Sequence, residues 1–218
     1  MPTSLTDIEV RVLGSLVEKQ VTTPEYYPLT INSLMLACNQ KNNRHPVTAY
    51  SEDTVVQAVE NLREKNLTYV FYGSTSRVPK FKHVMPEVLH LSQAQLALLC
   101  VLMLRGSQTV GELRERAARL HEFSSLEEVE TTLNSLITRE PERLVVRLPR
   151  QAGQKEVRFA HLLSGEVMAE ALTEEQAPGR ASPRDPDRLS IIQEDVAALK
   201  ISMEELRQRF ESFKKQFE

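Results

Sequence analysis

The sequence has no tryptophan, two cysteines and seven glycines among its 218 residues. So few glycines disfavour a turn-rich all-β fold and favour a largely helical one. Two cysteines cannot build the disulfide framework of a small secreted domain. Because Cys38 and Cys100 both lie within apolar helical patterns, we expect buried, reduced thiols in a cytoplasmic protein. No apolar run reaches the roughly 20 residues of a membrane-spanning helix, and the first ten residues have no signal-peptide pattern.

Motifs of catalysis are absent from the sequence as well. It contains no phosphate-binding loop, dinucleotide fingerprint, nucleophile elbow or HExxH zinc motif. The five histidines are scattered, and none pairs with a cysteine or a carboxylate at the spacing of metal ligands. We therefore expect a protein that is not an enzyme and that uses neither a metal nor another cofactor.

The net charge of −3 is unevenly distributed. The acidic excess lies in residues 163–218, whereas the preceding chain is close to neutral. The protein is thus not a basic domain of the kind that binds nucleic acid through net charge alone, but its local cations leave nucleic acid open as a partner.

Residues 5–84 predict three helices and a β-hairpin. Thr6 and Glu9 have the spacing of a capping box at the start of the first helix. Thr30 opens a second helix that ends near Cys38, and Ser51 opens a third. Residues 67–72 and 78–84 then predict two strands that enclose a turn rich in glycine and serine.

The same order of elements returns in residues 91–162. Ser92 and Gln95 repeat the capping box, Thr109 starts a second helix, and Ser124 or Ser125 starts a third. Residues 144–148 and 157–162 predict a second hairpin. Two such units in tandem are typical of winged helix-turn-helix domains. We predict a mainly α fold with small β-hairpins (α+β), with one winged-helix domain at residues 1–88 and another at residues 89–168.

The C-terminal part of the chain has a different pattern. Residues 169–188 are polar and rich in proline, which predicts a disordered linker. Beyond it, apolar residues alternate at spacings of three and four, which indicates a coiled-coil helix at residues 189–218 and a homodimer or another homo-oligomer. The alternative is that this helix packs back on its own chain. The apolar series consists of Leu189, Ile192, Val196, Leu199, Met203, Leu206, Phe210, Phe213 and Phe217.

Candidate contacts to double-stranded DNA fall in three places of the first unit. They are the turn between the second and third helices, the outward side of the third helix, and the hairpin. Acidic residues in the first turn of both third helices oppose the usual insertion into the major groove, and cations on a hairpin also serve simply to keep edge strands soluble. The candidates are Lys41, Asn42, Asn43 and Arg44 in the turn, Thr54, Gln57 and Asn61 in the helix, and Arg77, Lys80 and Lys82 in the hairpin, where Phe81 is interleaved. The second unit adds Arg114, Arg116 and Arg119 in its second helix and Arg147, Arg150, Lys155 and Arg158 in its hairpin.

Five longer stretches resemble the YceH-like family of uncharacterised bacterial proteins. They are EKQVTTPEYYPLT, ACNQKNNRHPV, RGSQTVGELRERAARLHEF, VVRLPRQAG and HLLSGEV. The resemblance spans residues 5–168 and implies a tandem winged-helix architecture, a cytoplasmic location and a coiled-coil tail. It does not imply a biochemical activity.

Two functions remain open on this basis. The first is a dimeric DNA-binding protein of the transcription-regulator type, which contacts DNA through the turn and the hairpin of the first domain. The second is a tandem winged-helix adaptor that binds protein partners, as in bacterial chromosome-segregation accessory proteins. Lys41, Arg44 and the basic hairpins favour the first function, whereas the acidic third helices favour the second.

Overall fold

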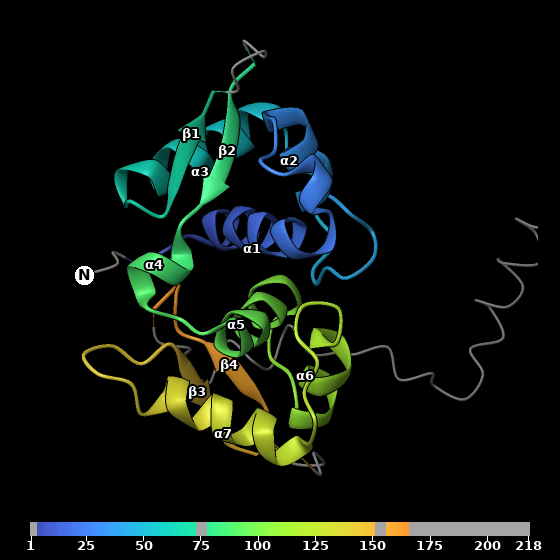
Figure 1. The fold of residues 1–218 in the computed structure, drawn as a ribbon, viewed down its shortest axis with the longest axis vertical. Helices are drawn as coiled ribbons and strands as arrows, with labels where there is room; N and C mark the ends of the chain where they lie inside the picture. Colours follow the sequence, from blue (N-terminus) through green and yellow to red (C-terminus); the bar gives the residue numbers. More distant parts are fainter. Residues whose placement is uncertain (1–3, 73–77, 151–155, 166–218) are drawn as a thin grey trace, which may run out of the picture. The chain divides into compact units, whose positions relative to one another are not determined.

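The computed structural model describes residues 4–72, 78–150 and 156–165. Within these residues the chain forms seven α-helices, a short 3-10 helix and two antiparallel sheets of two strands each (Figure 1). Residues Met1–Ala171 belong to one compact unit. The predicted linker at residues 169–188 and the predicted coiled-coil helix at residues 189–218 lie outside the described residues.

The first half confirms the predicted order of three helices and a hairpin. It consists of α1 (Asp7–Thr22), a 3-10 helix (Pro24–Tyr26), α2 (Ile31–Cys38), α3 (Glu52–Glu64), β1 (Thr68–Phe71) and β2 (Lys80–His83). The side chains of Thr6, Thr30 and Ser51 accept hydrogen bonds from the first turns of α1, α2 and α3, and Glu9 completes the capping box. The helix starts therefore lie where the sequence predicts them.

The second half repeats this order. A short helix, α4 (Met85–Leu89), which the sequence analysis did not predict, leads into α5 (Gln93–Arg105), α6 (Val110–Ala117), α7 (Leu126–Ile137), β3 (Val145–Arg147) and β4 (Phe159–His161). Ser92, Thr109 and Ser125 cap α5, α6 and α7, so Ser125 rather than Ser124 starts the third helix.

Each hairpin gains a third segment at an equivalent place. The backbones of Leu29 and Phe81 exchange two hydrogen bonds of 3.2 and 2.7 Å, and those of Gln108 and Phe159 exchange two of 3.0 and 2.8 Å. Leu29 and Gln108 both lie just before the second helix of their half, so the repetition seen in the sequence extends to backbone pairing.

Helix α1 lies between the two halves, with α2 and α3 on one side and α5 on the other (Figure 1). Residues from Glu9 to Glu18 are all buried, so the helix is covered all round. A Cβ atom on Gly14 would lie 3.0 Å from Cδ2 of Leu104, and the thiol of Cys100 donates a 3.5 Å hydrogen bond to the Gly14 carbonyl. Gly14 thus permits close packing of α1 against α5.

The hydrophobic core is continuous through both halves. Helix α4 runs across the boundary predicted between residues 88 and 89, and the two predicted domains share one core. Cys38 and Cys100 are both buried and free, as the sequence analysis predicts. No helix among the described residues is long and apolar enough to cross a membrane.

Candidate functional site

The turn between α2 and α3 is held together by a side chain at its start. The Asn39 amide donates a 2.8 Å hydrogen bond to the Tyr50 carbonyl, and its Oδ1 accepts a 2.8 Å hydrogen bond from the Tyr50 N–H. These two bonds hold the ends of the turn side by side. The side chain of Asn39 thus takes the place of hydrogen bonds between the two backbones.

Arg44, which the sequence analysis predicted to contact phosphate, lies inside the protein. Its side chain is 0% exposed and forms a 2.6 Å ion pair with Glu18, which is itself almost fully buried. The guanidinium also donates to the carbonyls of Ala37 and Asn43. A buried cation is stable only when it is paired and hydrogen-bonded. Burial raises the pKa of the Glu18 carboxyl, but the hydrogen bond from Arg44 and the charges of Arg44, Lys19 and Arg119 together lower it by more, so the net shift is downward.

The same turn is also attached to the second half. The N–H of His45 donates a 2.8 Å hydrogen bond to the Leu104 carbonyl at the end of α5. The Arg105 guanidinium donates to the Asn43 side chain. From the other side, Arg11 on α1 donates to the carbonyls of Cys38 and Pro46 at 3.1 and 2.6 Å. The turn therefore joins α1, α2 and α5.

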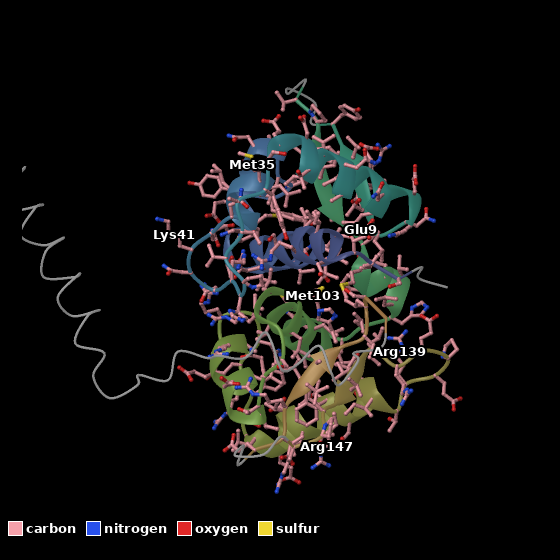
Figure 2. All side chains as sticks on the ribbon, turned by 180° about the vertical axis from the view of Figure 1, so that it is seen from behind. Glu9, Met35, Lys41, Met103, Arg139 and Arg147 are labelled. Atoms are coloured by element: carbon pink, nitrogen blue, oxygen red, sulfur yellow. The ribbon has the colours of Figure 1, made fainter. Side chains whose placement is uncertain are left out.

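Two of the four candidates in the turn face solvent. Lys41 and Asn42 are exposed, and Figure 2 shows Lys41 pointing away from the rest of the protein. Asn43 is half-buried and has a positive φ of 62°, a conformation that asparagine tolerates better than most residues. Of the two cations predicted to meet phosphate, Lys41 is exposed and Arg44 is buried.

The three candidates on α3 are partly occupied by local hydrogen bonds. The Thr54 hydroxyl lies 2.8 Å from that of Ser51, and the Gln57 amide donates a 2.9 Å hydrogen bond to Asn61. The exposed side of α3 carries Glu52, Asp53 and Glu64, while its Arg63 is paired with Glu60. This acidic surface opposes the insertion of α3 into a DNA groove.

The first hairpin has one face that combines aromatic rings with lysines. Tyr69 pairs with Lys82 and Phe71 with Lys80 across the strands, so these four side chains share a face. Tyr69 is 39% and Phe71 43% exposed, and the Lys82 ammonium lies 5.8 Å from the centre of the Tyr69 ring. We call these four residues the wing face. Arg77 lies outside the described residues.

The sequence analysis did not identify Tyr69 and Phe71, the two aromatic residues of the wing face. It named Phe81 as the aromatic residue among the cations, but Phe81 is 5% exposed and faces the core. The alternation of residues in β1 contains the signal, because Thr68 is buried, whereas Tyr69 and Phe71 both face solvent.

Comparison with known proteins places the chain in a family. Residues 5–154 match the family model described as "Protein of unknown function, DUF480". The chain is 52% identical to a UPF0502 protein of Opitutus terrae over 90% of its own length and 83% of the relative. It is 48% identical to a UPF0502 protein of Geobacter sulfurreducens over 98% of both chains, and 43% identical to one of Vibrio atlanticus over 97% of its own length and 99% of the relative. The chain thus belongs to the DUF480 family, whose curated bacterial members are called UPF0502 proteins, in agreement with the predicted YceH-like resemblance.

Proposed function

We propose that the protein is a cytoplasmic, non-enzymatic DNA-binding protein built from two winged helix-turn-helix units. The repeated order of three helices and a hairpin supports this assignment. The added pairings of Leu29 with Phe81 and of Gln108 with Phe159 support it further, because they give each hairpin a third short strand next to the second helix.

The wing face is the observation on which DNA binding rests. Lys80 and Lys82 present ammonium groups that suit phosphate oxygens, and the adjacent rings of Tyr69 and Phe71 offer flat apolar surfaces for sugars and base edges. Lys41 on the turn adds a further exposed cation. Because α3 is acidic on its exposed side, we propose contact through the wing face and the turn rather than through α3.

A salt series tests this proposal directly. The full chain is titrated into fluorescently labelled duplexes drawn from genomic fragments, and affinity is measured by anisotropy at several salt concentrations. Each phosphate contact contributes about 0.9 to the slope of log affinity against log salt. Replacement of Lys41, Lys80 or Lys82 by Gln should therefore reduce the slope by about 0.9 each.

Lys19→Gln is the matched control, because Lys19 lies on α1 outside the wing face and the turn. Phe71→Ala should weaken binding at every salt concentration without changing the slope, since it removes an uncharged contact. The proposal is refuted if the wild type does not bind DNA or binds it with an affinity that does not depend on salt. It is also refuted if Lys19→Gln reduces the salt slope as much as the variants of Lys41, Lys80 and Lys82 do.

A second candidate function is that of an adaptor for protein partners. The exposed acids of α3 favour it, together with two exposed apolar side chains, Leu36 on α2 at 60% and Val56 on α3 at 39% exposure. The variant Glu52→Gln/Asp53→Asn separates the two functions. If α3 lies near DNA, the loss of two negative charges raises DNA affinity. If α3 binds a basic protein surface instead, DNA affinity stays unchanged and affinity for that partner falls.

Self-association through residues 189–218 completes the proposal. Their apolar series at spacings of three and four is that of a coiled-coil seam. Deletion of residues 186–218 should lower the mass in light scattering from that of an oligomer to that of a single chain. An unchanged mass contradicts assembly through this segment.

A further inference from the structure

Several arginines converge where the turn between α2 and α3 meets the ends of α5 and α6. The carboxylate of Glu18 on α1 accepts a 2.6 Å hydrogen bond from Arg44 and, through its other oxygen, a 3.1 Å hydrogen bond from Arg119. Arg119 follows α6, and its side chain is 53% exposed. Glu18 therefore connects a guanidinium inside the protein with one at the surface.

Arg105 lies at the other end of the same chain of contacts. Arg44 donates a 2.9 Å hydrogen bond to the Asn43 carbonyl, and the Asn43 side chain accepts a hydrogen bond from Arg105. Desolvation lowers the pKa of Arg105, and the positive charges of Arg116 and Arg119 lower it further. Hydrogen bonds place Arg116 there too, because its guanidinium donates to the side chain of Gln108, whose amide donates a 3.0 Å hydrogen bond to the Arg105 carbonyl. Arg116 is thus linked to Arg105 through Gln108, as Arg119 is through Glu18, Arg44 and Asn43, and like charges gathered in this way repel one another.

This region contains five guanidinium groups, and two carboxylates form ion pairs with four of them. Glu18 is shared by Arg44 and Arg119, and Glu112 is shared by Arg116 at 3.3 Å and Arg158 at 3.2 Å. Among the described residues, Arg105 forms no ion pair with a carboxylate, and its bond to Asn43 uses a neutral acceptor. Arg119 uses a single nitrogen for Glu18. The region therefore carries an excess of positive charge and N–H groups that remain able to donate.

We propose that Arg105, Arg116 and Arg119 bind a phosphate group at this junction of the two halves. Guanidinium groups suit phosphate because their planar N–H pairs match two phosphate oxygens at once. A dianionic group also relieves the mutual repulsion of three cations, which a neutral ligand does not. The site is separate from the wing face and extends beyond the function proposed above. The phosphate is supplied either by a nucleic-acid backbone or by a free phosphorylated molecule, since both present the same oxygens.

Inorganic pyrophosphate is the probe for this site. The full chain is titrated calorimetrically at constant ionic strength, with sodium chloride as the reference salt. The wild type should bind pyrophosphate saturably, and Arg105→Gln and Arg119→Gln should each weaken binding at least tenfold. Arg147→Gln is the matched control and should bind like the wild type, because Arg147 is an exposed arginine on β3 at the far end of the second half (Figure 2).

The variant Arg119→Lys guards against a loss of binding caused by misfolding. It keeps the charge next to Glu18 and should bind more tightly than Arg119→Gln, while far-UV circular dichroism reports the fold of each variant. Non-saturable binding of pyrophosphate to the wild type overturns the proposal. Equal affinities of the wild type, Arg105→Gln and a folded Arg119→Gln overturn it as well.

Competition distinguishes the two sources of phosphate. If a DNA duplex displaces pyrophosphate and loses affinity for Arg119→Gln, the site receives a nucleic-acid backbone. If pyrophosphate binds but the duplex does not compete, the site receives a free phosphorylated molecule. Lys80→Gln/Lys82→Gln should bind pyrophosphate like the wild type, so that a failure of the wing face and a failure of the arginine site give different results.

Discussion

Replacement of Arg44 by methionine should destabilise the protein strongly, although Arg44 belongs to a polar turn. The substitution keeps an unbranched apolar stem in place of that of arginine but removes the guanidinium group and its charge. Glu18 would then keep its buried carboxylate with only Arg119, whose side chain is half exposed, as a partner. The carbonyls of Ala37 and Asn43 would also lose their donors.

The magnitude follows from the burial of the pair. Breaking a buried ion pair on one side costs about 3–5 kcal/mol, because the remaining charge stays in a medium that solvates it poorly. Arg119 compensates part of the charge of Glu18, so we expect about 3 kcal/mol for Arg44→Met. This is a large part of the ~5–15 kcal/mol that stabilise a typical domain.

A double-mutant cycle identifies the partner. Urea unfolding, followed by far-UV circular dichroism, gives the free energy of unfolding of the wild type, Arg44→Met, Glu18→Leu and the double variant. Because neither charge is left behind in the double variant, it should be more stable than the sum of the single effects predicts by about 2 kcal/mol. Lys41→Met is the matched control in the same turn and should change stability by less than about 0.5 kcal/mol.

One result would refute this account of Arg44. If Arg44→Met unfolds like the wild type but loses affinity for DNA, the side chain of Arg44 reaches solvent and meets phosphate, as the sequence analysis first predicted. A loss of stability without coupling to Glu18 would show that Arg44 acts through the backbone carbonyls alone.

Three further predictions concern other parts of the described structure. His83 is 1% exposed and burial lowers its pKa to about 4, so it stays neutral in the folded state while the unfolded chain binds a proton below about pH 6.5. His83 should therefore contribute a loss of stability of about 3 kcal/mol as the pH decreases from 6.5 to 4, in addition to that of His161, whose pKa burial also lowers to about 4, and urea unfolding of His83→Phe should show a weaker decline than the wild type. An equal decline in both proteins would exclude His83 as the cause. Gly14→Val should lower the free energy of unfolding by about 1–3 kcal/mol, because its Cβ already meets Leu104, whereas Gly111→Ala on α6 meets no atom within 4 Å and should raise it by about 0.4–1 kcal/mol. Thermal unfolding of the two glycine variants checks this contrast, and a shift of the same sign in both would contradict it. Asn39→Ala should cost about 1–2 kcal/mol through its two bonds to Tyr50, with faster amide exchange in the turn, and unaltered exchange there would argue against those bonds.

Local signals in the sequence predicted most of the secondary structure. Capping residues such as Thr6, Ser92 and Thr109 mark helix starts because they satisfy backbone N–H groups within three residues of themselves. The hairpins follow from alternation over a few residues in the same way. Such signals are complete within a short window, so no knowledge of the rest of the fold is needed to use them.

The position of Arg44 could not be predicted in this way. Its partner Glu18 lies 26 residues earlier, and no local pattern links a cation in a polar turn to a carboxylate on a helix. The structure buries α1 on all sides, because α5 covers the face that α2 and α3 leave open. Polar residues on a helix that is covered by two halves need partners from elsewhere in the chain, and the turn between α2 and α3 supplies one.

The wing face was predicted in part. Lys80 and Lys82 were identified because a hairpin of alternating residues sets them on one side. The two aromatic rings were missed because the exposed side of a two-stranded sheet is known only when its other side is known to pack on a core. Phe81 packs there, which turns Tyr69 and Phe71 outward.

The buried thiols have a practical consequence for experiments on this protein. Burial raises the pKa of Cys38 to about 11 and that of Cys100 above its usual range as well, so both remain protonated at neutral pH and out of reach of alkylating reagents. A single cysteine introduced at an exposed position such as Lys41 should therefore take up a maleimide dye selectively in the otherwise native sequence. Spectroscopic probes can thus be attached beside the proposed contact surface without first removing either native cysteine.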